Sequence, residues 1–391
     1  MEIEKQTFEC IRDGLTIRGA QYLPANSSES GKYPAVIVSH GFTGNYMGVE
    51  DYCVEFAKIG YAAFSFSFCG GGMLGEDARF KSDGETTDMT IFTEIEDLIT
   101  VKNYVKSLSY VETNELILVG ISQGGFVSGL TAARCGNEIK KLIMIYPAIC
   151  IPDHARRGCL GGSSYDPHNV PDIIDCGSTL LGKIFHETIV GMDPYLELAK
   201  YQGDILLLHG LDDDDVNYSY AIRAKESYRN GQCRLQLVRN LGHGFDSSQF
   251  DSAFASIRQF LTGRKEILTI RVIITHSDTV TEGDISKVSI FFTGYCDTPY
   301  FQGCILPEGC DSQEYNLGVQ TKMRAEYTLS GLDCNGQQCS IHIVNQKDGQ
   351  DWKPIVQTDS TALAWMNRAD LTAVLEFCEG GPTVRIFAEK E

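Results

Sequence analysis

Short apolar runs alternate with helical patterns through the first two-thirds of the sequence. Strands covered by helices on both faces are continuously apolar, so these runs predict buried parallel strands. They are residues 35–39, 62–66, 116–119, 142–145, 205–208 and 234–238. The pattern predicts an α/β domain over residues 1–262, with ligands bound beyond the carboxyl ends of a mostly parallel sheet.

One long stretch, about residues 150–195, interrupts this alternation. It contains several Gly and Pro residues among aromatic and aliphatic ones. So long an irregular segment between a strand and the next helix is usually functional, and we expect a cap over the active site. A disordered insertion is the alternative interpretation.

The periodicity changes after Thr262. From Ile267 onward apolar and polar residues alternate in steps of two, with Gly, Asp and Asn turns between the runs. The clearest runs are residues 268–274, 288–292, 323–329, 340–344 and 383–387. The pattern predicts a second, all-β domain over residues 266–391, an antiparallel barrel or sandwich.

A Gly-x-Ser-x-Gly motif occupies residues 120–124, directly after the apolar run 116–119 and before a helical pattern. In this context the motif is typical of a strained elbow that lifts a serine hydroxyl above the sheet of an α/β-hydrolase. The flanking glycines relieve the crowding. We therefore expect Ser122 to be a catalytic nucleophile, with a chance loop as the alternative.

A serine nucleophile needs a general base, which in this fold follows both the serine and the acid along the chain. Of the eight histidines, His243, His276 and His342 lie late enough, and the latter two fall within predicted strands of the β domain. His243 follows the run 234–238 in a Gly-His-Gly loop. We expect it to be the base.

The acid is expected after the run 205–208, where four aspartates, residues 212–215, are adjacent. Four neighbouring carboxylates cannot all be buried beside one imidazole, because they repel one another. We assign the acid to Asp213, since two residues separate it from His209-Gly210, a spacing common in these hydrolases. Asp212 is the alternative.

Attack on an ester produces an oxyanion, which two backbone N–H groups stabilise in this fold. The residue after the nucleophile, Gln123, is expected to supply one. The loop Ser39-His40-Gly41-Phe42 carries a His-Gly signature, and we assign the second donor to Phe42. His40 and His209 are interpreted as structural histidines.

Composition limits the partners. The formal charge of -19 argues against nucleic-acid and anionic membrane surfaces, which favour clustered Lys and Arg. A small-molecule ester substrate fits better. The first residues lack the apolar core of a secretory signal, and no apolar run is long enough to span a membrane, so we expect a cytoplasmic protein. Oligomeric state, including a homo-oligomer, stays open.

The 14 cysteines are spread along the chain, and reduced thiols are the expected state. Two pairs, Cys304/Cys310 and Cys334/Cys339, are spaced more widely than the hooks of structural zinc sites. We expect neither a metal nor an organic cofactor.

Residues 8–262 resemble bacterial cinnamoyl (feruloyl) esterases and related α/β-hydrolases. The likeness rests on the segments 39–44, 66–72, 81–84 and 93–98, on the elbow, and on the His-Gly-x-x-Asp motif. In that family the cap shapes an aromatic acyl pocket, which implies pocket roles for Tyr165 and Phe185. The cap has no tryptophan, so a general acyl or acetyl esterase is equally compatible.

The last third resembles an uncharacterised bacterial family of lipocalin-like barrels, through residues 303–307 and 361–367. No activity follows from that resemblance. Ligand binding, dimerisation and covering the esterase site are all open roles for this domain.

The sequence therefore predicts a serine carboxylesterase of Ser-His-Asp type, acting on cinnamoyl, feruloyl or acetyl esters. A peptidase of the same fold that cleaves amides is the first alternative. A catalytically inert hydrolase fold that binds a ligand is the second.

Overall fold

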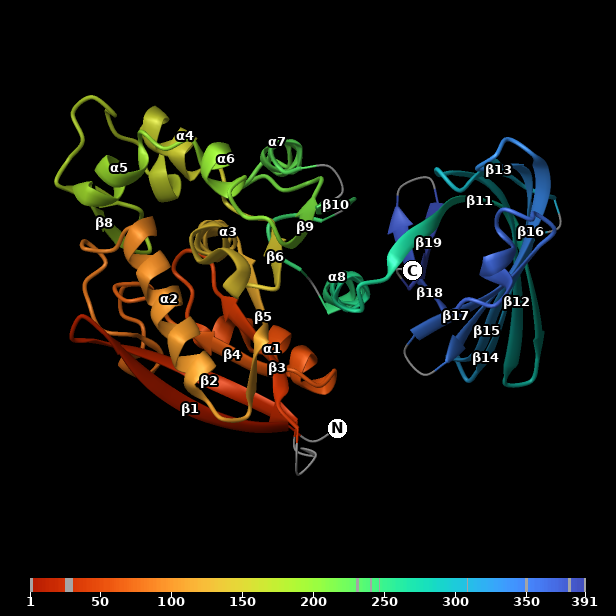
Figure 1. Ribbon diagram of the computed structural model, residues 1–391, viewed down its shortest axis with the longest axis horizontal. Helices are drawn as coiled ribbons and strands as arrows, with labels where there is room; N and C mark the ends of the chain where they lie inside the picture. Colours follow the sequence, from red (N-terminus) through yellow and green to blue (C-terminus); the bar gives the residue numbers. More distant parts are fainter. Residues whose placement is uncertain are drawn as a thin grey trace. The chain divides into compact units, whose positions relative to one another are not determined.

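The computed structural model describes residues 3–24, 31–229, 232–239, 241–245, 247–307, 309–348, 351–378 and 381–389. The chain divides into two compact units, unit 1 (Met1–Gly244) and unit 2 (Phe245–Glu391) (Figure 1). The sequence had suggested a boundary after residue 262. Helix α8 (Ser247–Leu261) instead belongs to unit 2, where the hydroxyl of Thr372 donates to Gln259 Oε1 at 2.7 Å.

Unit 1 is built on an eight-stranded mixed sheet in the order β1-β2-β4-β3-β5-β6-β9-β10. Strands β3, β4, β5, β6, β9 and β10 pair in parallel, whereas β1 and β2 are antiparallel to their neighbours. The strands are β1 (Ile3–Arg12), β2 (Leu15–Pro24), β3 (Tyr33–Ser39), β4 (Ala62–Phe66), β5 (Val111–Ile121), β6 (Lys141–Ile145), β9 (Asp204–Gly210) and β10 (Cys233–Val238). All six strands predicted from apolar runs are confirmed.

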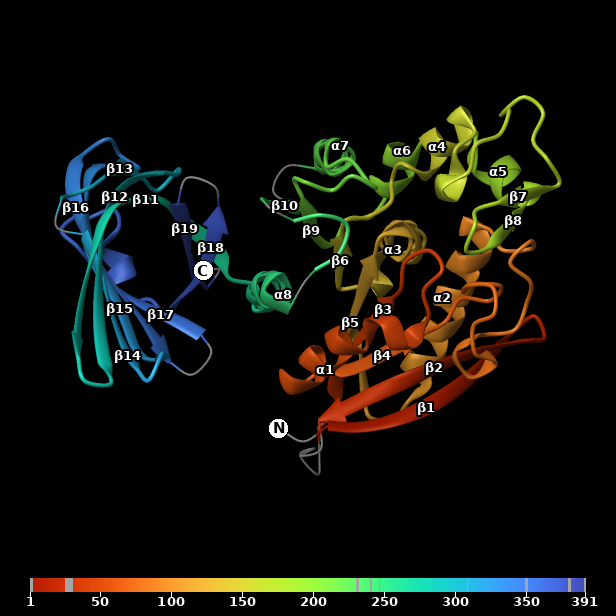
Figure 2. The ribbon, with the colours of Figure 1, turned by 180° about the vertical axis from the view of Figure 1, so that it is seen from behind.

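Helices cover both faces of this sheet (Figures 1 and 2). They are α1 (Glu50–Lys58), α2 (Ile91–Ser107), α3 (Gln123–Cys135), α6 (Pro194–Leu198) and α7 (Ser219–Ser227), with the 3₁₀ turns η1 (Tyr46–Val49), η2 (Ala78–Phe80) and η3 (Gly136–Glu138). Helix α1 contacts β2, β3 and β4, and α3 contacts β3, β5 and β6. Central strands are therefore buried on both sides, which explains their continuous apolar character.

The N-terminal hairpin β1–β2 was not predicted. Its turn at Asp13-Gly14 has positive φ at both residues, 50° and 86°, which an Asp-Gly pair accommodates well. That dipeptide was the signal available in the sequence. The apolar pattern was weak because β1 lies at the edge of the sheet, where Phe8 is its single buried residue.

The segment expected to form a cap is ordered, which excludes the disordered alternative. It contains α4 (Ile151–Arg157), η4 (Leu160–Gly162), a two-stranded hairpin of β7 (Ile173–Asp175) and β8 (Leu180–Gly182), and α5 (Lys183–Ile189). Its buried aliphatic side chains, such as Leu181 and Ile189, belong to the hydrophobic core of unit 1.

Unit 2 is all-β apart from α8 and the turn η5 (Ala364–Asn367). Its strands are β11 (Lys265–Glu282), β12 (Ile285–Asp297), β13 (Phe301–Ile305), β14 (Gly309–Asn316), β15 (Val319–Asp333), β16 (Gln338–Asp348), β17 (Asp351–Thr358), β18 (Leu371–Cys378) and β19 (Gly381–Ala388). All pairings are antiparallel, in the order β11-β19-β18-β17-β16-β15-β13-β12-β14.

The sheet of unit 2 turns back on itself, because β11 pairs with both β19 and β12. It encloses a core that includes Leu268, Leu329, Ile341 and Ile386, all fully buried. The sparsest pairing is between β17 and β18, where only Trp352 is matched with Ala373. The five predicted strands are confirmed, whereas β13, β14, β17 and β18 were not predicted.

Among the described residues, no helix combines the length and the apolar character that a membrane crossing requires.

We predict that Phe8→Ala lowers the free energy of unfolding of unit 1 by about 3–5 kcal/mol. The Phe8 ring stacks on Tyr104 at 4.8 Å and meets Phe64 edge-on, and the side chain is 6% exposed. The control on the same strand is Ile11→Ala, 61% exposed, which should change stability by less than about 0.5 kcal/mol. Urea unfolding followed by far-ultraviolet circular dichroism measures both, and equal losses would contradict the prediction.

Candidate active site

Ser122 lies between β5 and α3 in a strained conformation, with φ 54° and ψ −119°. The strain persists because the surroundings leave no alternative. A Cβ atom on Gly120 would lie 2.1 Å from the carbonyl oxygen of Gly124, and one on Gly124 would lie 2.2 Å from that of His40. Only glycine permits such contacts. The backbone N–H of Ser122 donates to Ile145 on β6, which fixes the elbow to the neighbouring strand.

The structure brings the three predicted triad residues together. His243 Nε2 lies 2.8 Å from Ser122 Oγ, and His243 Nδ1 lies 2.8 Å from Asp213 Oδ2. The residues come from three different loops at the carboxyl ends of β5, β9 and β10. This is the edge of the sheet where the sequence predicted the site.

Asp213 is buried, whereas Asp212, Asp214 and Asp215 are exposed. Its Oδ1 accepts the backbone N–H groups of Asp215 and Val216, at 3.1 and 2.8 Å. Burial opposes ionisation, but hydrogen bonds from His209, His243 and Val216 outweigh it and lower the pKa of Asp213 below its usual value. The group that faces His243 is therefore a carboxylate at neutral pH.

His40 and His209 support these elements, as expected of structural histidines. The Phe68 N–H donates to His40 Nε2 at 3.2 Å, so the proton of the neutral ring is on Nδ1, which donates to Gly41 at 2.7 Å. Burial lowers the pKa of His40 to about 4, which keeps the ring neutral. His209 Nε2 lies 2.8 Å from the Val216 carbonyl and 3.3 Å from Asp213.

The two predicted oxyanion donors belong to segments that lie close to the nucleophile. Gln123 is the first residue of α3, so its N–H has no acceptor within the helix. Phe42 follows Gly41, whose Cα is so near the elbow that a Cβ there would lie 3.1 Å from Ser122 Cβ. Among the described residues, the N–H of Phe42 has no hydrogen-bond acceptor.

The cap lies close to the loop that contains Phe42. A Cβ added to Gly161, in η4, would lie 3.0 Å from the Phe42 ring. The Tyr165 hydroxyl lies 2.9 Å from His186 Nδ1 on α5. Phe185 is only 2% exposed and belongs to the core of unit 1, so it has little surface to offer a ligand. Pocket roles for Tyr165 and Phe185 stay predictions.

Two residues of the site were not singled out in the sequence. Tyr146 directly follows β6 and has a positive φ of 34°, and its ring lies 4.7 Å from that of His243. Glu94, on α2, is 2% exposed and accepts from Gln123 Nε2 at 2.8 and 2.9 Å. The only local signal for Glu94 was a charged residue on the apolar face of a helical pattern.

Burial raises the pKa of Glu94 to about 8; the hydrogen bond from Gln123 lowers it in part, and Asp97 raises it further. Through its hydrogen bonds Glu94 fixes the side chain of Gln123, the residue that directly follows Ser122.

The remaining His, Cys, Asp and Glu residues that the structure describes were considered as metal ligands. Within the described ranges, no group of three or more His, Cys, Asp or Glu side chains could hold a metal ion. Thirteen of the 14 cysteines are free thiols, including both spaced pairs in unit 2.

Three comparisons bear on what this site does. Residues 2–169 match the model of the acetyl xylan esterase family (AXE1). Solved structures of Est1E from Butyrivibrio proteoclasticus, one with ferulic acid bound, are 28% and 26% identical to the chain, with TM-scores of 0.57 and 0.55. Each likeness covers 65% of this chain and 97% of Est1E. Unit 1 is a serine carboxylesterase of the α/β-hydrolase fold.

A curated protein of Aspergillus terreus, described as a probable dipeptidyl-aminopeptidase B, is 25% identical over 121 residues. The match covers 30% of this chain, and the chain spans only 13% of the length of that relative. The resemblance to feruloyl esterases inferred from sequence motifs is confirmed. The second unit is all-β as predicted, and its lipocalin-like identity stays a prediction.

We predict that Glu94→Gln changes how stability depends on pH. The folded state keeps the Glu94 proton up to about pH 8, whereas the unfolded chain loses it near 4.5, so wild-type stability falls as pH rises through that window. The variant has no proton to lose. From pH 5 to pH 8 its free energy of unfolding should therefore rise relative to wild type, by about 2 kcal/mol or more.

The matched control is Glu96→Gln on the same helix, because Glu96 is half exposed and paired with Arg134. Both tryptophans are in unit 2, so unfolding of unit 1 is followed by loss of esterase activity in urea, each variant normalised to its own native rate. Parallel pH profiles for wild type and Glu94→Gln would contradict the prediction.

Proposed function

We propose that unit 1 hydrolyses small-molecule carboxylic esters through an acyl-enzyme, with Ser122 as nucleophile, His243 as general base and Asp213 as the acid. The observation that carries this proposal is the pair of 2.8 Å hydrogen bonds that joins the three side chains. A serine paired in this way with a base, itself oriented by a third group, is the arrangement nucleophilic catalysis requires.

Proton movements follow from these contacts. The carboxylate of Asp213 accepts a hydrogen bond from the Nδ1–H of His243, which leaves Nε2 free to take the proton of Ser122 as the hydroxyl attacks the ester carbonyl. The imidazolium that forms is stabilised by the same carboxylate. It then protonates the leaving alcohol, and His243 activates the water that releases the acid.

The oxyanion would lie between the N–H groups of Phe42 and Gln123. Each such donor typically contributes about 2.7–4 kcal/mol of transition-state stabilisation. The N–H of Phe42 has no acceptor among the described residues, which supports its role because this donor is available to an oxyanion. Every step uses groups of this chain and needs no cofactor.

For the acyl group we propose an aromatic, cinnamoyl-type acid. The likeness to Est1E, whose structure holds ferulic acid, extends over nearly the whole of that protein, whereas the acetyl xylan esterase match ends at residue 169, within the cap. A panel of nitrophenyl and methyl esters from acetyl to feruloyl tests this choice. A kcat/KM that is highest for acetyl would replace it with an acetyl esterase.

The partial match to an aminopeptidase makes amide hydrolysis the second candidate. Peptide and ester chromogens with the same acyl group, assayed side by side, distinguish the two reactions. For the chain as a whole, we also propose a cytoplasmic location and a lipocalin-like barrel for unit 2, which cell fractionation and an experimental structure would test.

We predict that Ser122→Ala lowers kcat/KM for an aryl ester by about 10⁴-fold or more, because no other group can form the acyl-enzyme. Fluorophosphonate labelling should disappear in the same variant. Ser227→Ala on α7, whose hydroxyl only donates to the carbonyl of Ala224, is the control and should keep wild-type turnover. Substantial turnover by Ser122→Ala would exclude the triad mechanism.

We predict that Asp213→Asn lowers kcat by about 10³–10⁴-fold, because an amide favours the wrong tautomer of His243. The control is Asp212→Asn, which removes the same charge from the neighbouring, exposed residue. Its kcat should stay within about twofold of wild type. Comparable losses in both variants would mean that the charge of the loop matters and the Asp213 contact does not.

A further inference from the structure

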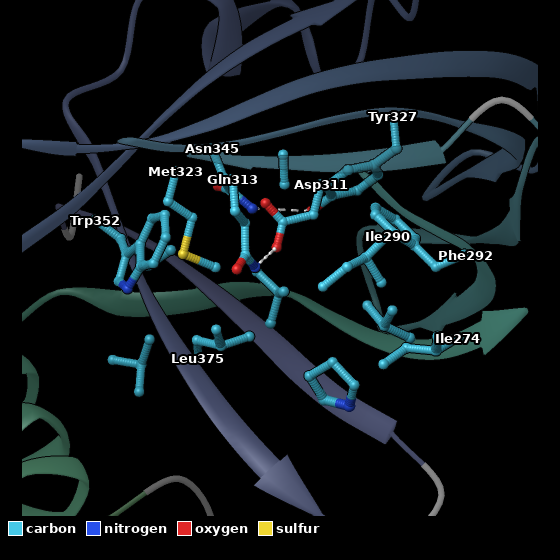
Figure 3. A pocket seen from close by; sticks show the side chains of 16 residues that line it. Ile274, Ile290, Phe292, Asp311, Gln313, Met323, Tyr327, Asn345, Trp352 and Leu375 are labelled. Carbon is cyan, nitrogen blue, oxygen red and sulfur yellow. Dashed lines mark hydrogen bonds between the residues drawn. The ribbon is translucent and has the colours of Figure 1, made fainter. Parts of the chain in front are cut away.

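Unit 2 contains a cavity of about 110 Å³ inside its curved sheet. Its wall is largely apolar, with Val, Ile, Phe, Leu, Met and Trp side chains from six strands. In Figure 3, Trp352 and Met323 lie on one side of this cavity, and Ile274, Ile290 and Phe292 lie on the other. An apolar space of this size holds one small ring or a short branched chain.

Two polar side chains in the cavity wall have hydrogen-bonding capacity left over. Asn345, on β16, is 5% exposed; its Nδ2 donates to Tyr327 at 3.2 Å, and its Oδ1 is buried with no partner. Asp311, on β14, accepts from Gln313 Nε2 through Oδ2 at 2.7 Å, and its Oδ1 is also buried without a partner. Both unpartnered atoms are acceptors.

A chain of hydrogen bonds through Gln313 fixes the orientation of Asp311. Gln313 Oε1 accepts from Tyr315 at 2.6 Å and from Gln320 at 3.1 Å, which leaves its Nε2 to donate to Asp311. Burial raises the pKa of Asp311, and the hydrogen bond from Gln313 lowers it in part. A buried acceptor that lacks a donor lowers stability by about 1–3 kcal/mol. Two such acceptors in one cavity wall therefore need an explanation.

We propose that this cavity binds a small molecule with an apolar body about the size of a benzene ring and one hydroxyl or amino group, which donates to Asp311 Oδ1. The apolar wall takes the body of the ligand, and this acceptor selects a donor over a plain hydrocarbon. This site lies wholly within unit 2 and is separate from Ser122, so it does not depend on the proposed esterase mechanism.

The probes are 4-fluorophenol and fluorobenzene, which differ by one hydroxyl group. Their binding to the full chain is measured by fluorine NMR line broadening and titration. We expect 4-fluorophenol to bind about tenfold more tightly than fluorobenzene. In Asp311→Leu that preference should fall to about twofold or less, while fluorobenzene binding stays or improves. Ser312→Ala, an exposed position on the same strand, should behave as wild type.

A cavity-filling variant tests the proposal independently, in case Asp311→Leu does not fold. Ala325 lines the cavity and pairs with Asp311 across β14 and β15, so Ala325→Phe should abolish binding of both probes. Far-ultraviolet circular dichroism and the fluorescence of Trp352 and Trp365, both in unit 2, report that each variant is folded.

Three results would overturn the proposal. One is that neither probe binds wild type at millimolar concentration, in which case water fills the cavity. Another is that the preference for the phenol survives Asp311→Leu, as it would if the phenol bound at the ester site. The third is that folded Ala325→Phe still binds both. Esterase assays on the same samples separate these outcomes from a failure of the triad.

Discussion

The close approach of the α3 N-terminus to the loop after β3 is the constraint on which the active site depends. Gly124 lies so near the His40 carbonyl that only a hydrogen atom fits in place of a Cβ, and Gly120 is as close to Gly124. This packing holds Ser122 at positive φ and turns its hydroxyl out of the sheet. It also brings the loop that contains Phe42, 81 residues before Gln123 in the chain, close to the elbow. The strain of the elbow is thus maintained by the packing of unit 1 as a whole.

Much of this site could be predicted because it is encoded locally. The elbow is a five-residue motif, and the order of Ser122, Asp213 and His243 follows from the order of the strands. Asp213 could be preferred over Asp212 by spacing, and the burial of Asp213 alone among the four aspartates agrees with that preference. Tyr146 and Glu94 could not be predicted in the same way. Their roles arise from contacts with His243 and Gln123 that only the folded chain creates.

Two of the strands that sequence analysis missed, β1 and β14, have different physical reasons for their weak patterns. Edge strand β1 buries little, so its apolar alternation is weak. In β14 the positions that face the cavity carry Asp311 and Gln313 instead of apolar residues, which hides the period of two. Departures from the local pattern are expected where a protein gives up stability for function. The failure of the pattern at β14 therefore coincides with the polar network that we interpret as a ligand site.

Three acidic residues illustrate how this chain, with a formal charge of -19, uses carboxyl groups in different environments. Asp213 is buried but receives several donors, so it stays ionised and can stabilise a cation. Glu94 is buried with one amide donor, and its pKa rises to about 8. Asp311 resembles Glu94 in having a single amide donor, yet it faces a cavity and leaves one oxygen unpartnered. The number of donors around a buried carboxyl group thus separates the roles that we propose for Asp213, Glu94 and Asp311.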